Sequence, residues 1–109
     1  MGVNAAIKHA LTPLPWPSMQ HPAQGNTAIY LTWQAINTRP EGWASNESHR
    51  MSHMVQVNVF SCSQLLDADL DTVLNALRAG GVTVQYAGPH NYEPDTKLHH
   101  IPITCRWQE

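Results

Sequence analysis

A chain of 109 residues is long enough for one domain with a single core and too short for two. Charged residues make up only 13% of it and the net charge is −2, whereas soluble domains usually carry about a quarter charged residues. With no basic excess and no apolar run near the ~20 residues that span a bilayer, specific nucleic-acid recognition and membrane insertion are both disfavoured.

Two elements and a connector are predicted before residue 38. Apolar residues recur at helical spacing over Val3–Leu11, which predicts a short helix. Prolines at positions 13, 15 and 17 stop this helix, because proline lacks an N–H donor and restricts the residue before it. We therefore expect residues 12–26 to form a Pro-rich connector. Residues 27–37 alternate in hydropathy and are rich in β-branched and aromatic side chains, which predicts a strand.

A long loop follows the first strand and carries the best candidate contact residues. Turn chemistry at Arg39-Pro40-Glu41-Gly42 ends the strand, and a second strand is predicted over residues 51–60. The loop of residues 38–49 between them exceeds the two to five residues common in hairpins. Tryptophan, tyrosine and arginine are favoured interface anchors. We thus predict a protein-interface patch at Trp43 with Arg39 and Arg50; the alternative is that Trp43 folds back over the core.

The second half of the sequence predicts a helix and two further strands. Its apolar stripe consists of Leu66, Leu70, Val73, Leu74 and Leu77. Gly80 or Gly81 is expected to cap the helix. Strands are predicted over residues 82–86 and 97–107, with an exposed turn at residues 92–96 that adds Tyr92 to the interface candidates. Pro102 predicts that the last strand lies at an edge or is bulged, since proline gives no ladder donor.

These elements predict one domain, residues 1–109, of the α+β class. Their order is α-β-β-α-β-β. Antiparallel pairing of neighbouring strands is the simplest topology. We therefore expect a four-stranded antiparallel sheet with the helices packed on one face.

Seven histidines invite a metal-site interpretation. His49 and His53 are four residues apart, but on a strand that spacing separates their Cα atoms by about 13 Å. His99 and His100 are adjacent, so on a strand they point to opposite faces. Since neither an HExxH motif nor a close Cys/His cluster is present, we expect no metal ligands and no cofactor.

The cysteines give no stronger catalytic pattern. Cys62 and Cys105 form no CxxC pair, and we expect two reduced thiols. Ser61-Cys62-Ser63 lies between a predicted strand and helix but lacks the glycines of a nucleophile elbow. We expect Cys62 to pack as a small hydrophobe and predict no enzyme; a Cys62–His dyad is the alternative.

The second half also resembles a known family. The residues that carry the resemblance are the runs Val55-Gln-Val-Asn-Val-Phe-Ser61, Leu77-Arg-Ala-Gly-Gly81, Asn91-Tyr-Glu-Pro-Asp-Thr96 and His99-His-Ile101. Together they resemble the small tail-completion, or tail-terminator, proteins of long-tailed bacteriophages. Gly81 departs from the family pattern, which has phenylalanine there, and this removes an apolar anchor.

The resemblance implies a structural virion protein without enzymatic activity. Such proteins form a ring of their own copies, often a hexamer, that caps the tail tube and joins it to the head. The expected partners are copies of the chain, the tail tube protein and a head–tail connector protein. DNA passes through the ring without specific recognition. The resemblance implies assembly in the host cytoplasm and a final place at the head–tail junction; another head–tail connector or a minor tail protein is the alternative.

Overall fold

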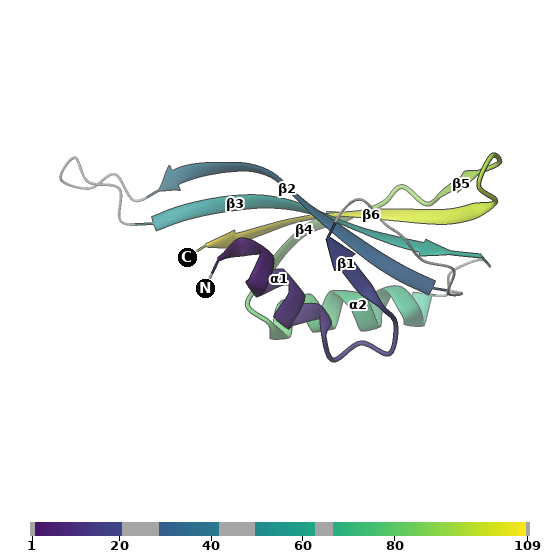
Figure 1. Ribbon diagram of the computed structural model, residues 1–109, viewed down its shortest axis with the longest axis horizontal. Helices are drawn as coiled ribbons and strands as arrows, with labels where there is room; N and C mark the ends of the chain where they lie inside the picture. The colour runs from purple at the N-terminus through teal and green to yellow at the C-terminus, as the bar shows by residue number, and fades with distance from the viewer. Residues whose placement is uncertain (1, 21–28, 42–49, 63–66, 109) are drawn as a thin grey trace.

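The computed structural model describes residues 2–20, 29–41, 50–62 and 67–108. They form an α+β fold in which two helices lie on one side of a six-stranded sheet (Figure 1). The strand order across the sheet is β1-β2-β3-β6-β4, and β5 also pairs with β6. The elements are α1 (Val3–Leu11), β1 (Ser18–Gln20), β2 (Ile29–Glu41), β3 (Arg50–Ser61), α2 (Asp67–Ala79), β4 (Thr83–Ala87), β5 (Asn91–Glu93) and β6 (Leu98–Gln108).

The predicted class and the helices on one face are confirmed, but the predicted four-stranded sheet and its element order are wrong. The described order is α-β-β-β-α-β-β-β, because two strands of three residues each, β1 and β5, join the sheet. Strand β1 lies inside the predicted Pro-rich connector and pairs parallel to β2, so the sheet is not purely antiparallel. The Leu31 N–H donates to the Pro17 carbonyl at 2.9 Å and starts this pairing. Strands this short have too few residues to show a hydropathy period.

Two prolines lie inside strands where the sequence predicted a strand end or a sheet edge. Pro40 continues β2 as the partner of Met51 in β3, at a level where no described strand pairs with the other side of β2. Pro102 lies in β6, which is a central strand and not an edge. Its carbonyl accepts a hydrogen bond from the Gly88 N–H at 2.8 Å. In an antiparallel strand the N–H and C=O of one residue point to the same side, so the missing Pro102 donor falls in the gap between β4 and β5.

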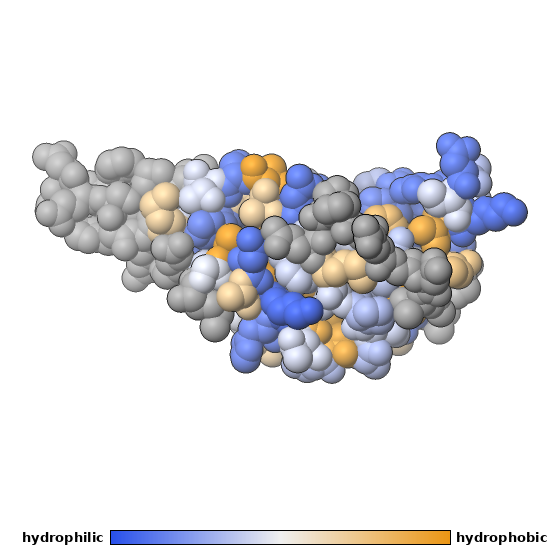
Figure 2. Space-filling model, in the orientation of Figure 1, coloured by the Kyte–Doolittle hydropathy of each residue, from blue (hydrophilic) through white to orange (hydrophobic). Residues whose placement is uncertain are grey.

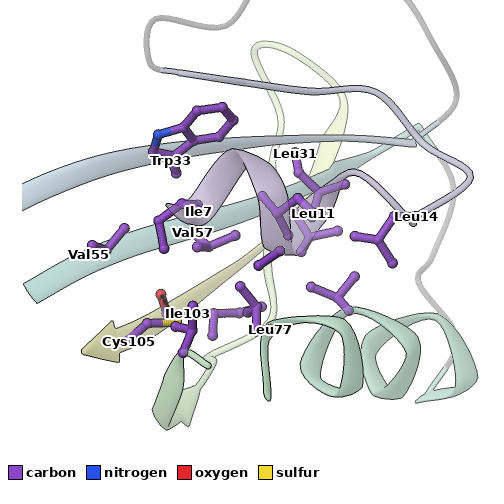
Figure 3. Packing of buried hydrophobic residues seen from close by; sticks show 14 of the residues in the cluster. Ile7, Leu11, Leu14, Leu31, Trp33, Val55, Val57, Leu77, Ile103 and Cys105 are labelled. Carbon is purple, nitrogen blue, oxygen red and sulfur yellow. Dashed lines mark hydrogen bonds between the residues drawn. The ribbon is translucent and has the colours of Figure 1, made fainter. Parts of the chain in front are cut away.

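The hydrophobic core lies between the helices and the middle of the sheet (Figure 3). Hydropathy alternates along residues 51–60 and 97–107, and in the middle of β3 and β6 every second residue accordingly faces the helices. The fully buried side chains include Ile7, Leu11, Val55, Val57, Val73, Leu77, Ile101, Ile103 and Cys105. Burying one aliphatic side chain of this kind contributes about 1.5–3 kcal/mol before entropy is counted. Leu66, the first residue of the predicted stripe, lies outside the described residues.

The end of α2 shows why both glycines are needed. Gly81 has φ +84, a left-handed conformation that strains any side chain. Its N–H donates to the Arg78 carbonyl and the Val82 N–H donates to the Leu77 carbonyl, the two bonds of a Schellman cap. Val82 is buried at 2% exposure and supplies the apolar contact that usually follows such a cap. The departure at Gly81 therefore does not leave this corner without an apolar anchor.

Gly80 has a different role, because it lets the two helices touch. A Cβ built on Gly80 would fall against the Cβ of Ala10 in α1 and 2.8 Å from the Ala10 Cα. Real Cβ atoms do not approach backbone atoms this closely. Any side chain at this position forces α1 and α2 apart.

We predict that Gly80→Ala destabilises the protein by roughly 1–3 kcal/mol, the cost typical of overpacking a core. The measurement is the free energy of unfolding in urea, with Gly81→Ala as the matched control. That control changes a neighbouring glycine around which a Cβ meets nothing within 4 Å, so it reports backbone strain alone. Combining Gly80→Ala with Ala10→Gly should recover part of the loss. Equal effects of Gly80→Ala with and without Ala10→Gly would contradict the helix contact.

Candidate functional site

The residues predicted for one interface patch do not lie together. Arg39 and Arg50 belong to the paired ends of β2 and β3, whereas Tyr92 belongs to β5. Arg39 pairs with Ser52 of β3, and Ser52 pairs with Gln108 of β6, so Arg39 lies at the level of Gln108. Tyr92 pairs with His99 of β6. His99 and Gln108 are nine residues apart on β6, about 30 Å at the rise of a strand. The two groups therefore occupy opposite ends of the long axis (Figure 1).

Among these candidates the structure describes one side chain. Tyr92 is 53% exposed, and its ring lies 4.9 Å from that of His99. Trp43 and most of its loop lie outside the described residues. The interface role of all four residues therefore stays a prediction.

The face of the sheet that points away from the helices, here called the open face, carries a row of stacked rings. The register aligns Tyr30 of β2 with Phe60 of β3, and Phe60 with His100 of β6. The ring centroids of Tyr30 and Phe60 are 5.1 Å apart, and those of Phe60 and His100 are 4.6 Å apart. Stacked rings at these separations gain more than their buried area alone provides. This aromatic row ties three strands together at one end of the sheet.

Polar groups extend the row on both sides of His100. The His100 Nε2–H donates to the Asn58 Oδ1 at 2.7 Å, and the His100 Nδ1 lies 3.6 Å from the Glu93 Oε1. The Asn58 Nδ2 in turn donates to the Thr32 Oγ1 at 3.4 Å. Thr32 has no exposed surface. The neighbouring strands β5, β6, β3 and β2 each contribute one side chain to this row of polar contacts. The row therefore holds these four strands in register on the open face.

Burial and the charge of Glu93 shift the pKa of His100 in opposite directions. Loss of water around the ring lowers the pKa of His100 below its ordinary value of 6.5, and this effect exceeds the rise in pKa caused by the Glu93 carboxylate. For Tyr30 burial has the opposite sign: it raises the pKa of the phenol, and Glu93 and Cys62 add smaller increases. Both shifts favour the uncharged ring. The aromatic row is therefore neutral at pH 7.

The thiols differ from each other and partly from expectation. Both are free, as predicted. Cys62 is exposed, so the prediction that it packs as a small hydrophobe is wrong; it follows the last residue of β3 and comes after Val59, the last core side chain of that strand. Cys105 is buried, and burial raises its pKa to about 12. Neither ring nitrogen of His100 is directed at a thiol, since one contacts Asn58 and the other Glu93.

The other described histidines are also dispersed. His53 shares a 2.7 Å hydrogen bond with the Thr38 hydroxyl and stacks on Trp107 at 5.5 Å. His99 and His100 contact different rings, as their adjacent positions predicted. Within the described residues, no group of three or more histidine, cysteine, aspartate or glutamate side chains could hold a metal ion.

Two exposed apolar side chains were not predicted as site residues. Ile36 is 49% exposed and lies where the register of β2 against β3 shifts. Tyr86 is 63% exposed. Regular alternation along residues 82–86 would place Tyr86 on the same face as Val84, but a bulge between the two aligns Tyr86 with Thr104 on the open face. One extra residue reverses the side-chain parity of a strand, and the sequence gives no sign of that residue.

The visible surface in Figure 2 carries apolar residues in small separate groups, with a mainly hydrophilic tip at the turn between β5 and β6. No helix among the described residues has the length and apolar character needed to cross a membrane. The chain matches no model of a known protein family, and no curated protein matches it.

We predict that the Glu93 carboxylate tunes the His100 titration. Glu93→Gln removes the negative charge that raises the pKa of His100, so this pKa should fall further. NMR titration of the His100 ring protons measures it. Asp95→Asn is the matched control, because it removes a negative charge from the same turn outside this contact. Equal shifts in both variants would contradict the Glu93–His100 interaction.

The same pKa predicts how stability depends on pH. Because folding lowers the pKa of His100, the unfolded chain binds more protons between that pKa and 6.5. The stability gained from the neutral ring is complete above pH 6.5 and is lost as the pH falls through the folded-state value. Urea unfolding across this range should show a shallower pH slope in His100→Gln than in the unaltered protein. An identical slope would contradict the prediction.

Proposed function

We propose that the chain is a tail-terminator, or tail-completion, subunit of a long-tailed bacteriophage. In this proposal its copies assemble in the host cytoplasm into a ring, with a hexamer as the expected form. The ring caps the tail tube and joins it to the head. The chain would contact its own copies, the tail tube protein and a head–tail connector protein, and DNA would pass through the lumen.

The observation that carries the proposal is a sheet that can be extended on two opposite sides. Strand β4 pairs with β6 alone among the described strands, and β1 covers β2 only at residues 31–33. Free strand edges present rows of N–H and C=O groups that pair readily with another chain. A subunit with two such sides can contact one neighbour on each, which is the requirement for a closed ring.

The low charge supports the same proposal. A ring that lets DNA slide through must not bind phosphates tightly, and phosphate binding requires many lysine and arginine side chains. The chain has six of these residues in 109 and a net charge of −2. The motif resemblance in residues 51–104 supplies the choice of a tail terminator over other ring-forming proteins.

The proposal predicts rings with a central hole in micrographs of the purified protein, and a mass by light scattering several times that of one chain. Mixed with tail tubes and with filled heads of the encoding phage, these rings should bind the end of the tube. Binding to heads without binding to tubes would favour another head–tail connector. A protein that formed no ring and bound neither structure would contradict the proposal.

A further inference from the structure

The two sheet edges that have no partner among the described strands lie directly across from each other. Gln34 of β2 aligns with Gln56 of β3, which aligns with Thr104 of β6, which aligns with Tyr86 of β4. Beyond Trp33, where the pairing with β1 ends, β2 has no described strand on its outer side. The four strands thus form a section in which neither outer strand has a second partner among the described strands at this level.

We infer that these edges bind each other between copies, so that β4 of one copy pairs with residues 34–38 of β2 in the next. This inference rests on the proposed ring-forming function and names its subunit contact. The partner at each edge is therefore a second copy of this chain.

Strand direction allows the contact without any change in the fold. Each neighbouring pair from β2 through β3 and β6 to β4 is antiparallel. With four strands in the section, β2 and β4 run in opposite directions. A second copy placed beside the first therefore brings β2 antiparallel to β4, and the hydrogen-bond ladder continues across the boundary.

The side chains on both edges suit this contact. Residues 34–38 and 83–87 include no charged side chain, although exposed edges usually carry charges that prevent pairing. Each edge instead exposes one large apolar residue, Ile36 on β2 and Tyr86 on β4. Pairing the edges would cover both residues and would bring no like charges together.

The bulges make the pairing selective. Each edge strand departs from regular register once, between Ala35 and Asn37 in β2 and between Val84 and Tyr86 in β4. A bulge increases the local twist of its strand and turns the edge away from a flat strand. A partner strand must therefore share this twist to continue the ladder.

Chemical cross-linking between two single-cysteine variants tests this contact. The background is Cys62→Ser, which removes the exposed thiol, while Cys105 stays buried. Asn37→Cys marks the β2 edge and Gln85→Cys marks the β4 edge; both positions are exposed, and Ile36 and Tyr86 stay in place. A short flexible bis-maleimide joins cysteines that lie close across the contact. Asn75→Cys, on the exposed side of α2, is the matched control.

We expect the mixture of the two edge variants to give the heterodimer at roughly tenfold over either homodimer, since only this pair brings both cysteines to one contact. Adding Tyr86→Lys to the Gln85→Cys chain should abolish the product, and the Asn75→Cys control should give none. Homodimers of Gln85→Cys alone would show a symmetric β4–β4 contact and overturn the inference. Absence of the heterodimer would overturn it whatever the oligomeric state.

The same experiment separates this inference from the proposed function. Rings in micrographs without the 37–85 cross-link would overturn the contact and leave the tail-terminator proposal standing. Cross-linked chains that never close into rings would support the contact and contradict that proposal.

Discussion

The close approach of α1 and α2 at Gly80 is the constraint on which the rest of the structure depends. The apolar sides of β3 and β6 need cover, and two short helices can supply it only if no gap opens between them. The missing side chain at Gly80 lets Ala10 come into contact, and the left-handed Gly81 then turns the chain toward β4. One Gly-Gly pair thus fixes both the packing of the helices and the start of the next strand.

Two helices of nine and thirteen residues cover only part of one face of this sheet. The principal extents of the molecule are 51 × 26 × 23 Å, and α2 is about 20 Å long at 1.5 Å per residue. The strands β2, β3 and β6 therefore extend beyond the helices (Figure 1). On the open face, ring stacking and a row of hydrogen bonds hold the strands together in place of an apolar core. His100 joins the two, because its ring stacks on Phe60 while its nitrogens contact Asn58 and Glu93.

The sequence predicts the parts of this fold that local periodicity determines. The helix at Val3–Leu11 and the inward residues of β3 and β6 follow from hydropathy alone. Parts set by contacts distant in sequence are not predictable in this way. Strand β1 exists because β2 offers it an edge, and Pro102 is tolerated because β4 ends opposite it. The exposed position of Tyr86 depends on a bulge, so no alternation pattern could identify it as a surface residue.

The strand register places two uncharged segments, residues 34–38 and 83–87, at the outer strands of the sheet. An uncharged, partly apolar strand edge favours uncontrolled association unless another chain covers it. A single contact of five residues, the length of β4, is short, and a stable interface usually buries more than about 1,000 Å². A closed ring removes both difficulties, because every subunit then makes two contacts and no edge stays open. An open filament of the same contacts always leaves two edges exposed and can grow without limit. If the two edges pair as inferred, the twist between neighbouring copies decides whether the chain forms a ring or an aggregate.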